Sequence, residues 1–490
     1  MFVTIQKYWA YFSFFFLASI ALFANLGTDP LACWDESRQA INAVEMLDHK
    51  NPFITTYEGE VDLWNTKPSL LVATQSLSFA VLGISEFALR LPTALAALLL
   101  CLGVFRFFIH EYKSYWGAFT AVSILLSISG YNGYHGVRTG DYEGFLTLFA
   151  TLFILCFYKF LKKEDKNSLF LFFIFFTLSV LSKGITAFMF LPGLFLYALF
   201  SGKIFSITRM PVFWIGLLSS LLVIILYYGY REYHSQGFLQ VIYDNELGGR
   251  FNKVKEGNSG AWNYYLIGLL SERALPWVPI ILLSYTLRLF TIKRKNIWLT
   301  PLVYFGVLNF SWLFFISIAK TKLAWYDVPM FPLTAILGGL LFSELEQKYK
   351  QSHSKVLQKI FPVFCIIVIL ISGNQISENV QKGIPTCEYC TESNQIAFFL
   401  KEGIQNGKNY AGYIMSTQFA YKAIPVFYKE MYQRKYKQPM VFKIPKEWGD
   451  GDRVLLLQAN LLDEIPSHIG ANIVEDKYGI LEIEIYSQTK

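Results

Sequence analysis

The sequence has few charged residues for its length. Only 16% of its 490 residues are charged, whereas 54% are hydrophobic and 18% are aromatic, and the mean hydropathy is +0.37. Soluble domains carry roughly 25% charged residues, so this composition excludes an ordinary soluble protein and indicates a polytopic membrane protein. The net charge of +7 does not indicate a nucleic-acid partner, because the basic residues fall in gaps between apolar runs and form no stripe.

Several motifs are also missing. The six histidines show no H-x-x-x-H spacing, so no metal site can be recognised, and no divalent-metal cofactor is supported by the sequence. The absence of G-x-x-x-x-G-K-[ST] and of a dinucleotide fingerprint gives no support for a nucleotide cofactor. Among six cysteines, only Cys387 and Cys390 form a C-x-x-C pair. If that part of the chain lies outside the cell, a disulfide is favoured there over zinc.

Apolar runs of membrane-spanning length fill much of residues 8–373. Since a helix needs about 20 apolar residues to cross the hydrocarbon core, we expect a polytopic all-α protein of about 11 transmembrane helices. The first run is treated as a retained helix, because it lacks a clear signal-peptide cleavage site. The fifth and sixth runs are short, so we expect them to pack against neighbouring helices or to form re-entrant segments. The expected spans are residues 8–26, 86–108, 116–135, 143–161, 168–181, 185–200, 211–230, 274–290, 298–318, 325–343 and 357–373.

The polar gaps between these runs are of two kinds. One kind is rich in Lys and Arg and carries little else. All of these basic gaps fall on one side under a single assignment of the spans, and the positive-inside rule places that side in the cytoplasm. Their residues are Lys113, Lys162, Lys163, Lys166, Lys203, Arg209, 293–295, Lys348, Lys350 and Lys355.

The other gaps are longer and are expected on the extracytoplasmic face. Residues 27–85 end in a predicted interfacial helix at 69–82, and residues 231–273 contain glycines that favour a mobile lid. Residues 374–490 are expected to form a soluble α/β domain after a transmembrane domain of residues 1–373. Its predicted elements are a helix at 393–401 and strands at 454–457 and 481–485.

Three carboxylates on the outer face are candidates for catalysis. Asp35 and Glu36 directly follow the first span, and Arg38 lies one helical turn from Asp35. Asp141 opens the fourth span from the outside, among glycines that leave room for a substrate. A carboxylate at such a place also stabilises a helix amino terminus, so each candidate has a structural alternative.

Six cations on the same face are unfavourable under the positive-inside rule. A bound anion explains them, most simply a lipid phosphate at headgroup depth, to which each charge-assisted hydrogen bond would contribute roughly 1.5–3 kcal/mol. We expect one or two of the six to pair with carboxylates instead. The set is Arg38, Lys67, Arg138, Lys183, Arg273 and Lys322.

Seven short segments, in order, resemble those of the C-type glycosyltransferases that use polyprenyl-phosphate sugars. The similarity is greatest to the lipid A aminoarabinose transferases and the protein O-mannosyltransferases, and it runs from about residue 5 to 345. The segments are Trp34-Asp35-Glu36-Ser37-Arg38, Trp64-Asn65-Thr66-Lys67-Pro68, 87–94, Arg138 with Asp141, Leu181-Ser182-Lys183-Gly184, Pro276-Trp277 and 321–332.

The resemblance implies an inverting transfer of a monosaccharide from a polyprenyl-phosphate donor to an extracytoplasmic lipid, glycan or protein. It implies a bacterial inner-membrane enzyme with its active site on the periplasmic face. By position, Asp35 corresponds to the essential carboxylate, with Asp141 and Glu36 beside it. The donor phosphate would be bound by Arg38, Lys67, Arg138, Lys183 and Lys322.

Two departures from the family pattern limit what is implied. The lipid A branch has a metal-binding Glu before its Lys-Pro, where this chain has Thr66, which argues against a zinc ion there and against a lipid A acceptor. The repeated extra domains of the eukaryotic mannosyltransferases are absent as well. A transferase with an oligosaccharide-pyrophosphate donor and a transporter of lipid-linked glycans remain alternatives.

Overall fold

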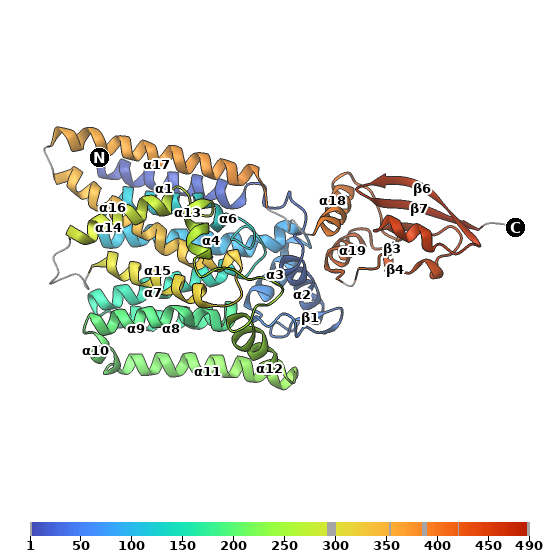
Figure 1. The fold of residues 1–490 in the computed structure, drawn as a ribbon, viewed down its shortest axis with the longest axis horizontal. Helices are drawn as coiled ribbons and strands as arrows, with labels where there is room; N and C mark the ends of the chain where they lie inside the picture. Colours follow the sequence, from blue (N-terminus) through green and yellow to red (C-terminus); the bar gives the residue numbers. More distant parts are fainter. Residues whose placement is uncertain (1, 292–299, 352–353, 385–389, 420, 488–490) are drawn as a thin grey trace.

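The computed structural model describes residues 2–291, 300–351, 354–384, 390–419 and 421–487. An elongated bundle of helices carries a small α/β domain at one end (Figure 1). We call that end of the bundle the tail end and the opposite one the far end. The predicted fold, a polytopic helical membrane protein with a small C-terminal α/β domain, is confirmed.

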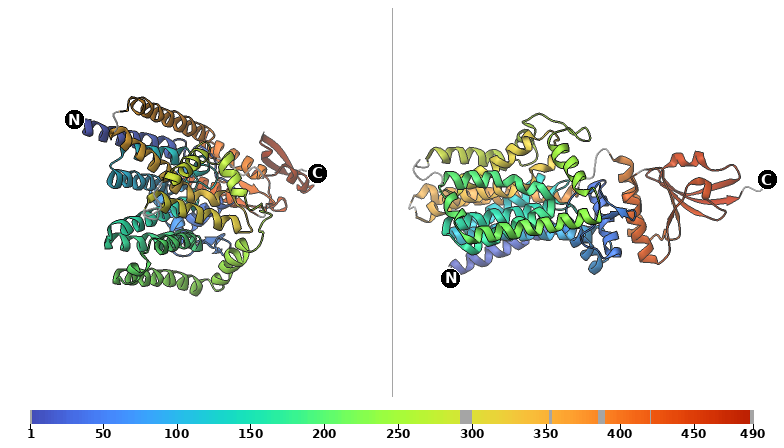
Figure 2. Two further views of the ribbon diagram at one scale, coloured as in Figure 1. Left: turned by 60° about the vertical axis from the view of Figure 1, so that its left-hand side comes forward. Right: turned by 90° about the horizontal axis from the view of Figure 1, so that it is seen from below.

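The long helices of the bundle run roughly parallel to its length (Figures 1 and 2). Within the described residues, seven helical stretches are long and apolar enough to cross a membrane, and four apolar helices are shorter. The exact number of spans therefore stays a prediction. The bundle contains α1 (Phe2–Phe23), α4 (Glu86–Tyr112), α5 (Tyr115–Ser127), α7 (Glu143–Lys163), α8 (Lys166–Lys183), α9 (Leu191–Phe200), α11 (Pro211–His234), α14 (Trp277–Thr291), α15 (Pro301–Ile318), α16 (Phe331–Gln351) and α17 (Lys355–Gln381).

Short elements connect these helices, mainly at the tail end. Helix α3 confirms the interfacial segment expected at 69–82 as helical. These elements are α2 (Asp35–His49), β1 (Thr56–Tyr57), β2 (Glu60–Val61), α3 (Leu70–Leu82), α6 (Ser129–Asn132), the 3-10 helix η1 (Gly184–Phe190), α10 (Ile204–Thr208), α12 (Phe238–Ile242), the π-helix η2 (Tyr243–Phe251), α13 (Tyr264–Ser271) and the 3-10 helix η4 (Ala324–Met330).

The chain reverses direction at Gly184, between the fifth and sixth predicted spans. Helix α8 begins at the far end and ends at Lys183, and Gly184 takes a φ of +63° that favours glycine. Segments η1 and α9 then return to the far end, where α10 lies (Figure 1). The basic gaps between α7 and α8 and between α9 and α11 thus share the far end.

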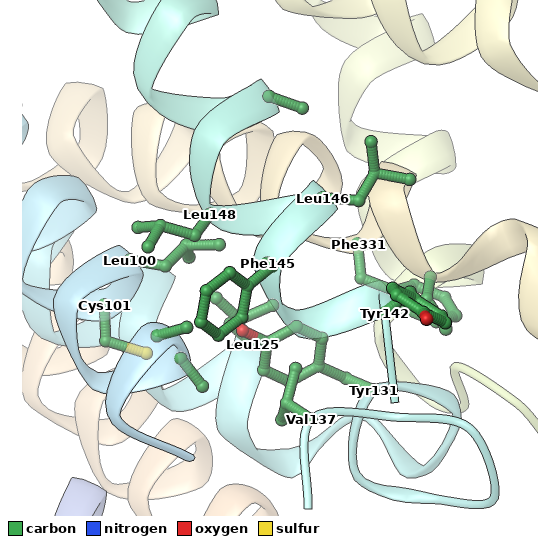
Figure 3. Packing of buried hydrophobic residues seen from close by; sticks show 14 of the residues in the cluster. Leu100, Cys101, Leu125, Tyr131, Val137, Tyr142, Phe145, Leu146, Leu148 and Phe331 are labelled. Atoms are coloured by element: carbon green, nitrogen blue, oxygen red, sulfur yellow. The ribbon is translucent and has the colours of Figure 1, made fainter. Parts of the chain in front are cut away.

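Close packing of small residues holds the centre of the bundle. A Cβ atom on Gly339 of α16 would lie 2.7 Å from Ala121 of α5 and 2.6 Å from Phe108 of α4, so only glycine permits this approach. Under the tail end, Tyr131 and Val137 lie against Phe145 in a buried cluster (Figure 3). This cluster supports the turn that carries Asp141.

The C-terminal domain begins after α17, which continues to Gln381 and so passes the predicted boundary at residue 373. The sheet order is β4-β3-β5-β7-β6, with β3 parallel to β4 and β5 and the remaining pairs antiparallel. The predicted helix at 393–401 and the predicted strand at 481–485 are confirmed within α18 and β7, and the strand predicted at 454–457 overlaps β5, which ends at Leu456. The elements are α18 (Thr391–Gln405), β3 (Ile414–Ser416), α19 (Ala423–Tyr436), β4 (Val441–Phe442), η5 (Pro445–Glu447), β5 (Arg453–Leu456), η6 (Ala459–Glu464), β6 (Ile469–Lys477) and β7 (Ile480–Ser487).

Buried polar contacts fix this domain to the tail end. The Tyr428 hydroxyl donates to Glu86 at 2.7 Å, and Lys401 forms an ion pair with the same carboxylate at 2.9 Å. Cys390 is disulfide-bonded, and the partner favoured by the sequence, Cys387, lies outside the described residues. The domain therefore packs directly on the beginning of α4.

Candidate active site

Helix α2 begins at Asp35 and presents this carboxylate at the tail end. The preceding residue, Trp34, has a φ of +67°, a conformation that is uncommon outside glycine. The Tyr421 hydroxyl from the C-terminal domain donates to the Trp34 carbonyl at 2.7 Å, and the two rings stack with centroids 4.9 Å apart. The C-terminal domain thus holds the backbone that positions Asp35.

Asp35, His135 and Asp141 come together although they lie far apart in sequence. One ligand atom from each lies within 4.8 Å of the others. His135 Nδ1 contacts Asp141 directly and lies 3.7 Å from Asp35 Oδ2, and its ring stacks on Trp325 at 3.7 Å. The sequence predicted the two aspartates as site residues but not His135. The only sequence signal for His135 was its position in the same turn as Asp141.

The two carboxylates have different environments. The Asp141 side chain is buried and accepts a hydrogen bond from Gln39 at 3.0 Å, whereas 34% of the Asp35 side chain is exposed to the cavity. Burial alone would raise the pKa of Asp141, but His135 and Gln39 outweigh it and lower this pKa to about 2. Burial, together with the negative charge of Asp141, raises the pKa of Asp35.

Glu36 does not share this cavity. Its two oxygens accept from the Arg90 guanidinium at 2.8 and 2.9 Å, and they also accept from the backbone N–H groups of Ala32 and Gly140 at 2.8 Å. All of these groups are buried. The contacts of Glu36 therefore favour a structural ion pair over the catalytic role that its position next to Asp35 predicted.

A cavity of about 380 Å³ opens beside Asp35 and Asp141. Its polar part holds Lys67, Lys183 and Arg250. Its apolar part lies at the ends of the bundle helices and is lined by Leu146, Ile185, Phe188, Met189, Trp312 and Phe315. The arrangement suits a molecule with an anionic group and an apolar chain.

Two lysines of this cavity are paired with carboxylates. Lys67 donates to Glu246, and Lys183 donates to Glu143. Burial, with the positive charges of Arg250 and Lys183 nearby, lowers the pKa of Lys67 well below its usual range. An anion that enters the cavity would therefore displace these carboxylates from the lysines. This applies above all to Glu246, which lies on the connecting segment η2.

Two more cations of the predicted set, of which Arg38 also lines the cavity, are paired with other carboxylates. Arg38 pairs with Asp62 through two contacts of 2.8 Å, and Arg273 pairs with Asp327. With Lys67 and Lys183, four of the six therefore have carboxylate partners within the described residues, so the expectation of one or two was wrong. Long-range pairing of this kind leaves no sequence signal.

Arg138 and Lys322 lie against backbone carbonyls instead of the cavity. Arg138 is buried and donates to the carbonyls of Ala24 and Asn379 at 2.6 and 3.3 Å. Lys322 donates to Ile316 at 3.0 Å and to two further carbonyls at the carboxyl end of α15, where a cation is stabilising. Neither residue is brought together with Lys67 and Lys183.

The segment 231–273 supplies functional residues that the sequence did not single out. Glu246, Arg250 and Lys255 line the cavity. The segment is tied to residues 320–322 by backbone hydrogen bonds of 3.0 Å, including one from Thr321 N to the Arg250 carbonyl. It therefore forms one wall of the cavity, and its predicted movement as a lid stays a prediction.

The chain is similar to a known protein family and to solved structures. The family model described as dolichyl-phosphate-mannose-protein mannosyltransferase matches residues 66–228. The structure superposes on ArnT from Cupriavidus metallidurans bound to undecaprenyl phosphate with a TM-score of 0.70 at 14% identity, covering 96% of this chain and 97% of ArnT. It also superposes on the apo oligosaccharyltransferase of Archaeoglobus fulgidus with a TM-score of 0.50 at 12% identity, covering 89% and 65% of the chains.

The chain therefore has the same overall fold as ArnT. The fold that the sequence resemblance implied is thereby confirmed, and the mannosyltransferase family model, which matches part of the chain, agrees with that resemblance. An uncharacterised protein of Aquifex aeolicus is 24% identical over 334 residues, which cover 68% of this chain and 64% of the relative. The match thus spans less than two thirds of that relative's length.

The lipid A branch that the sequence resembles has a metal ligand at the position of Thr66. At Thr66 the fit is poor, because the nearby Glu246 carboxylate is engaged by Lys67. Asp35, His135 and Asp141 do fit, since two carboxylates and an imidazole within 4.8 Å are suitable ligands for a divalent cation. A metal site at this triad was not recognisable from the sequence.

Proposed function

We propose that the protein transfers a monosaccharide from a polyprenyl-phosphate donor to an acceptor outside the cytoplasmic membrane, with inversion at the anomeric carbon. The observation that carries this proposal is the cavity in which Asp35 and Asp141 adjoin Lys67, Lys183 and Arg250, with apolar walls at the helix ends. The cations match a phosphate, and the apolar walls match a polyprenyl chain.

In the proposed reaction the acceptor oxygen attacks the anomeric carbon while the bond from that carbon to the phosphate oxygen breaks. Asp35 is the carboxylate exposed to the cavity, so it accepts the proton of the acceptor hydroxyl. The phosphate leaves with the bonding electron pair, and Lys67, Lys183 and Arg250 stabilise its growing charge. No protein nucleophile is required.

Asp141 and His135 position Asp35 in this mechanism. Their direct contact fixes the charges around Asp35, and Gln39 from α2 binds the other Asp141 oxygen. Asp35, His135 and Asp141 would hold a divalent cation, which would supply positive charge to the site when bound. The residues of the cavity perform the steps above irrespective of that ion.

The location follows from the two ends of the bundle. We infer that the far end faces the cytoplasm, because its interhelical gaps carry the lysines and arginines that the positive-inside rule retains there. The cavity and the C-terminal domain then lie on the extracytoplasmic face. A cavity of about 380 Å³ favours one sugar with its phosphate over an oligosaccharide-pyrophosphate donor.

The test is a comparison of lipid extracts from cells that contain the wild-type protein, no protein, or Asp35→Asn. Polyprenyl-phosphate sugars are quantified by mass spectrometry. We expect one such species to accumulate in both deficient strains. Equal pools in all three strains would contradict the donor class and would favour transport of a lipid-linked glycan.

A further inference from the structure

A continuous stack of five side chains lies beside Asp35 and joins the soluble domain to the first outer segment. The rings of Trp34 and Tyr421 stack at 4.9 Å, and those of Tyr421 and Tyr57 at 6.4 Å with an interplanar angle of 1°. The Arg38 guanidinium lies 4.1 Å from the Tyr57 ring centroid and 4.7 Å from that of Trp64. The stack therefore starts next to Asp35, at Trp34, and ends at Trp64.

The Trp64 end of this stack is open and faces the reaction cavity. Trp64 is 46% exposed and is one of the residues that line the cavity with Asp35. Since Arg38 covers one face of the indole, the exposed surface belongs mainly to the other face and the ring edge. The stack thus presents a flat aromatic surface at the mouth of the cavity.

This surface is held rigidly. Asp62 binds Arg38 with both oxygens at 2.8 Å and also accepts from the backbone N–H of Trp64 at 3.0 Å. The Asn42 side chain donates to the same Asp62 carboxylate at 3.0 Å. Arg38 is therefore committed to supporting the indole, and ligand binding would cost little ordering of this side chain.

A flat, rigid indole face beside a glycosyl-transfer cavity suits a sugar ring. The C–H groups of one pyranose face are apolar and pack on aromatic faces, while the hydroxyl groups stay hydrated or bind polar neighbours. Interfacial tryptophans also anchor proteins in lipid headgroups, but Trp64 lines a cavity together with Asp35, Lys67 and Arg250. A ligand in the cavity is therefore the better partner for it.

We propose that the open face of Trp64 binds a sugar ring of the acceptor, so that the acceptor is a carbohydrate or a glycolipid. This inference rests on the proposed function. The donor phosphate is assigned to Lys67, Lys183 and Arg250 inside the cavity, whereas Trp64 lies at its half-exposed mouth, through which a water-soluble acceptor group enters. Trp64 then orients the acceptor hydroxyl toward Asp35.

The experiment is saturation-transfer-difference NMR with the full protein in lipid nanodiscs. The probes are methyl β-glucopyranoside, methyl β-galactopyranoside and methyl β-N-acetylglucosaminide, each measured with the protein saturated with undecaprenyl phosphate. We expect transfer to the axial C–H protons of one ring face for at least one probe. That signal should fall about threefold or more in Trp64→Ala and persist in Trp64→Phe.

Trp262→Ala is the matched control, because Trp262 is 75% exposed and does not line the cavity. Its signal should equal that of the wild type, and unchanged melting temperatures would show that the variants are folded. The proposal is overturned if no probe gives a signal, or if Trp64→Ala keeps the wild-type signal. It is also overturned if the signal appears only without undecaprenyl phosphate, since Trp64 would then bind the donor sugar.

Failure of this inference and failure of the proposed function are distinguishable in the same samples. Binding of undecaprenyl phosphate is measured separately, by native mass spectrometry. Absence of a sugar signal in the wild-type protein, with intact lipid binding, would refute the carbohydrate acceptor and leave the proposed donor class standing. Absence of lipid binding would instead count against the proposed function, whatever the sugar probes show.

Discussion

The two ends of the helical bundle contain the same kinds of ion pair in different surroundings. At the far end, Lys162 and Lys163 pair with Glu111, and the two lysine side chains are 42% and 46% exposed. At the tail end, the side chains of Lys183 and Glu143 are 9% and 2% exposed. The lysines of the far-end pairs therefore remain partly hydrated, whereas both members of the tail-end pair are removed from water.

The energetic consequences of this difference are large. An exposed ion pair contributes about 0–1 kcal/mol, because water and salt screen it. Removing one partner of a buried pair costs about 3–5 kcal/mol, since the other charge stays behind without compensation. Substitutions at the tail end should therefore have much larger effects than matched substitutions at the far end or on exposed faces.

The largest effect is expected for Asp35→Asn. The amide cannot accept the acceptor proton, so the transfer rate should fall by about 10²–10⁴-fold while the protein remains folded and inserted. The control is Asp48→Asn on the same helix, where Asp48 forms an exposed pair with Arg434. Transfer of the labelled sugar in proteoliposomes is the measurement, and a wild-type rate in Asp35→Asn would refute its assignment.

A loss of stability is expected for Glu36→Gln. This change breaks the buried pair with Arg90 and should destabilise the protein by about 3–5 kcal/mol. Glu164→Gln is the comparison at the far end, because Glu164 is 59% exposed in its pair with Lys203. In thermal unfolding in detergent, the first variant should melt well below the wild type and the second should match it. Similar melting temperatures for both would contradict the contrast between the ends.

A smaller effect of opposite sign is expected for Glu246→Gln. Since Glu246 competes with a phosphate for Lys67, its neutralisation should tighten undecaprenyl phosphate binding about fivefold, equivalent to about 1 kcal/mol. Glu256→Gln is the matched change, because Glu256 is 58% exposed beside Arg250. Titration of the lipid by native mass spectrometry gives both dissociation constants. Weaker binding in Glu246→Gln would mean that this carboxylate supports the site.

An effect of similar size is expected for Tyr421→Phe. The stacking on Trp34 would remain, but loss of the hydroxyl removes its hydrogen bond to the Trp34 carbonyl, worth about 0.5–1.5 kcal/mol, and its hydrogen bond with Ser37 Oγ at 3.0 Å. We therefore expect kcat to fall about two- to tenfold without a change in donor KM. Tyr413→Phe is the control, because its hydroxyl donates to Glu482 within the same domain. Equal kcat values for the two variants would show that the soluble domain does not position Asp35.

Much of the fold followed from the sequence because hydropathy marks helices that must bury their backbone polar groups in lipid. The same signal misplaced the end of α17, since an apolar run ends at the membrane surface while the helix continues through polar residues to Gln381. The strand β7 was recognisable from strict alternation at Leu481–Ile485. These are local patterns, and local patterns are visible in a single sequence.

The site was less predictable, because it depends on contacts between distant residues. Asp35 and Asp141 were found as carboxylates next to spans, but Lys67 and Glu246 lie 179 positions apart. Arg250 was missed, since it lies in a connecting segment without periodicity. Lys322 was predicted at the phosphate and lies instead at carbonyls of α15, a use of a cation that no sequence pattern distinguishes from binding.

The most direct test of the account compares lysines and arginines from the two ends in one binding experiment. Native mass spectrometry would count undecaprenyl phosphate bound to the wild type, to a tail-end variant (Lys67→Ala with Arg250→Ala) and to a far-end variant (Lys162→Ala with Lys163→Ala). Loss of two charge-assisted contacts should weaken binding about a hundredfold or more in the tail-end variant. The far-end variant should bind like the wild type. Undiminished binding in the tail-end variant, or loss in the far-end variant, would contradict the assignment of the lipid-phosphate site.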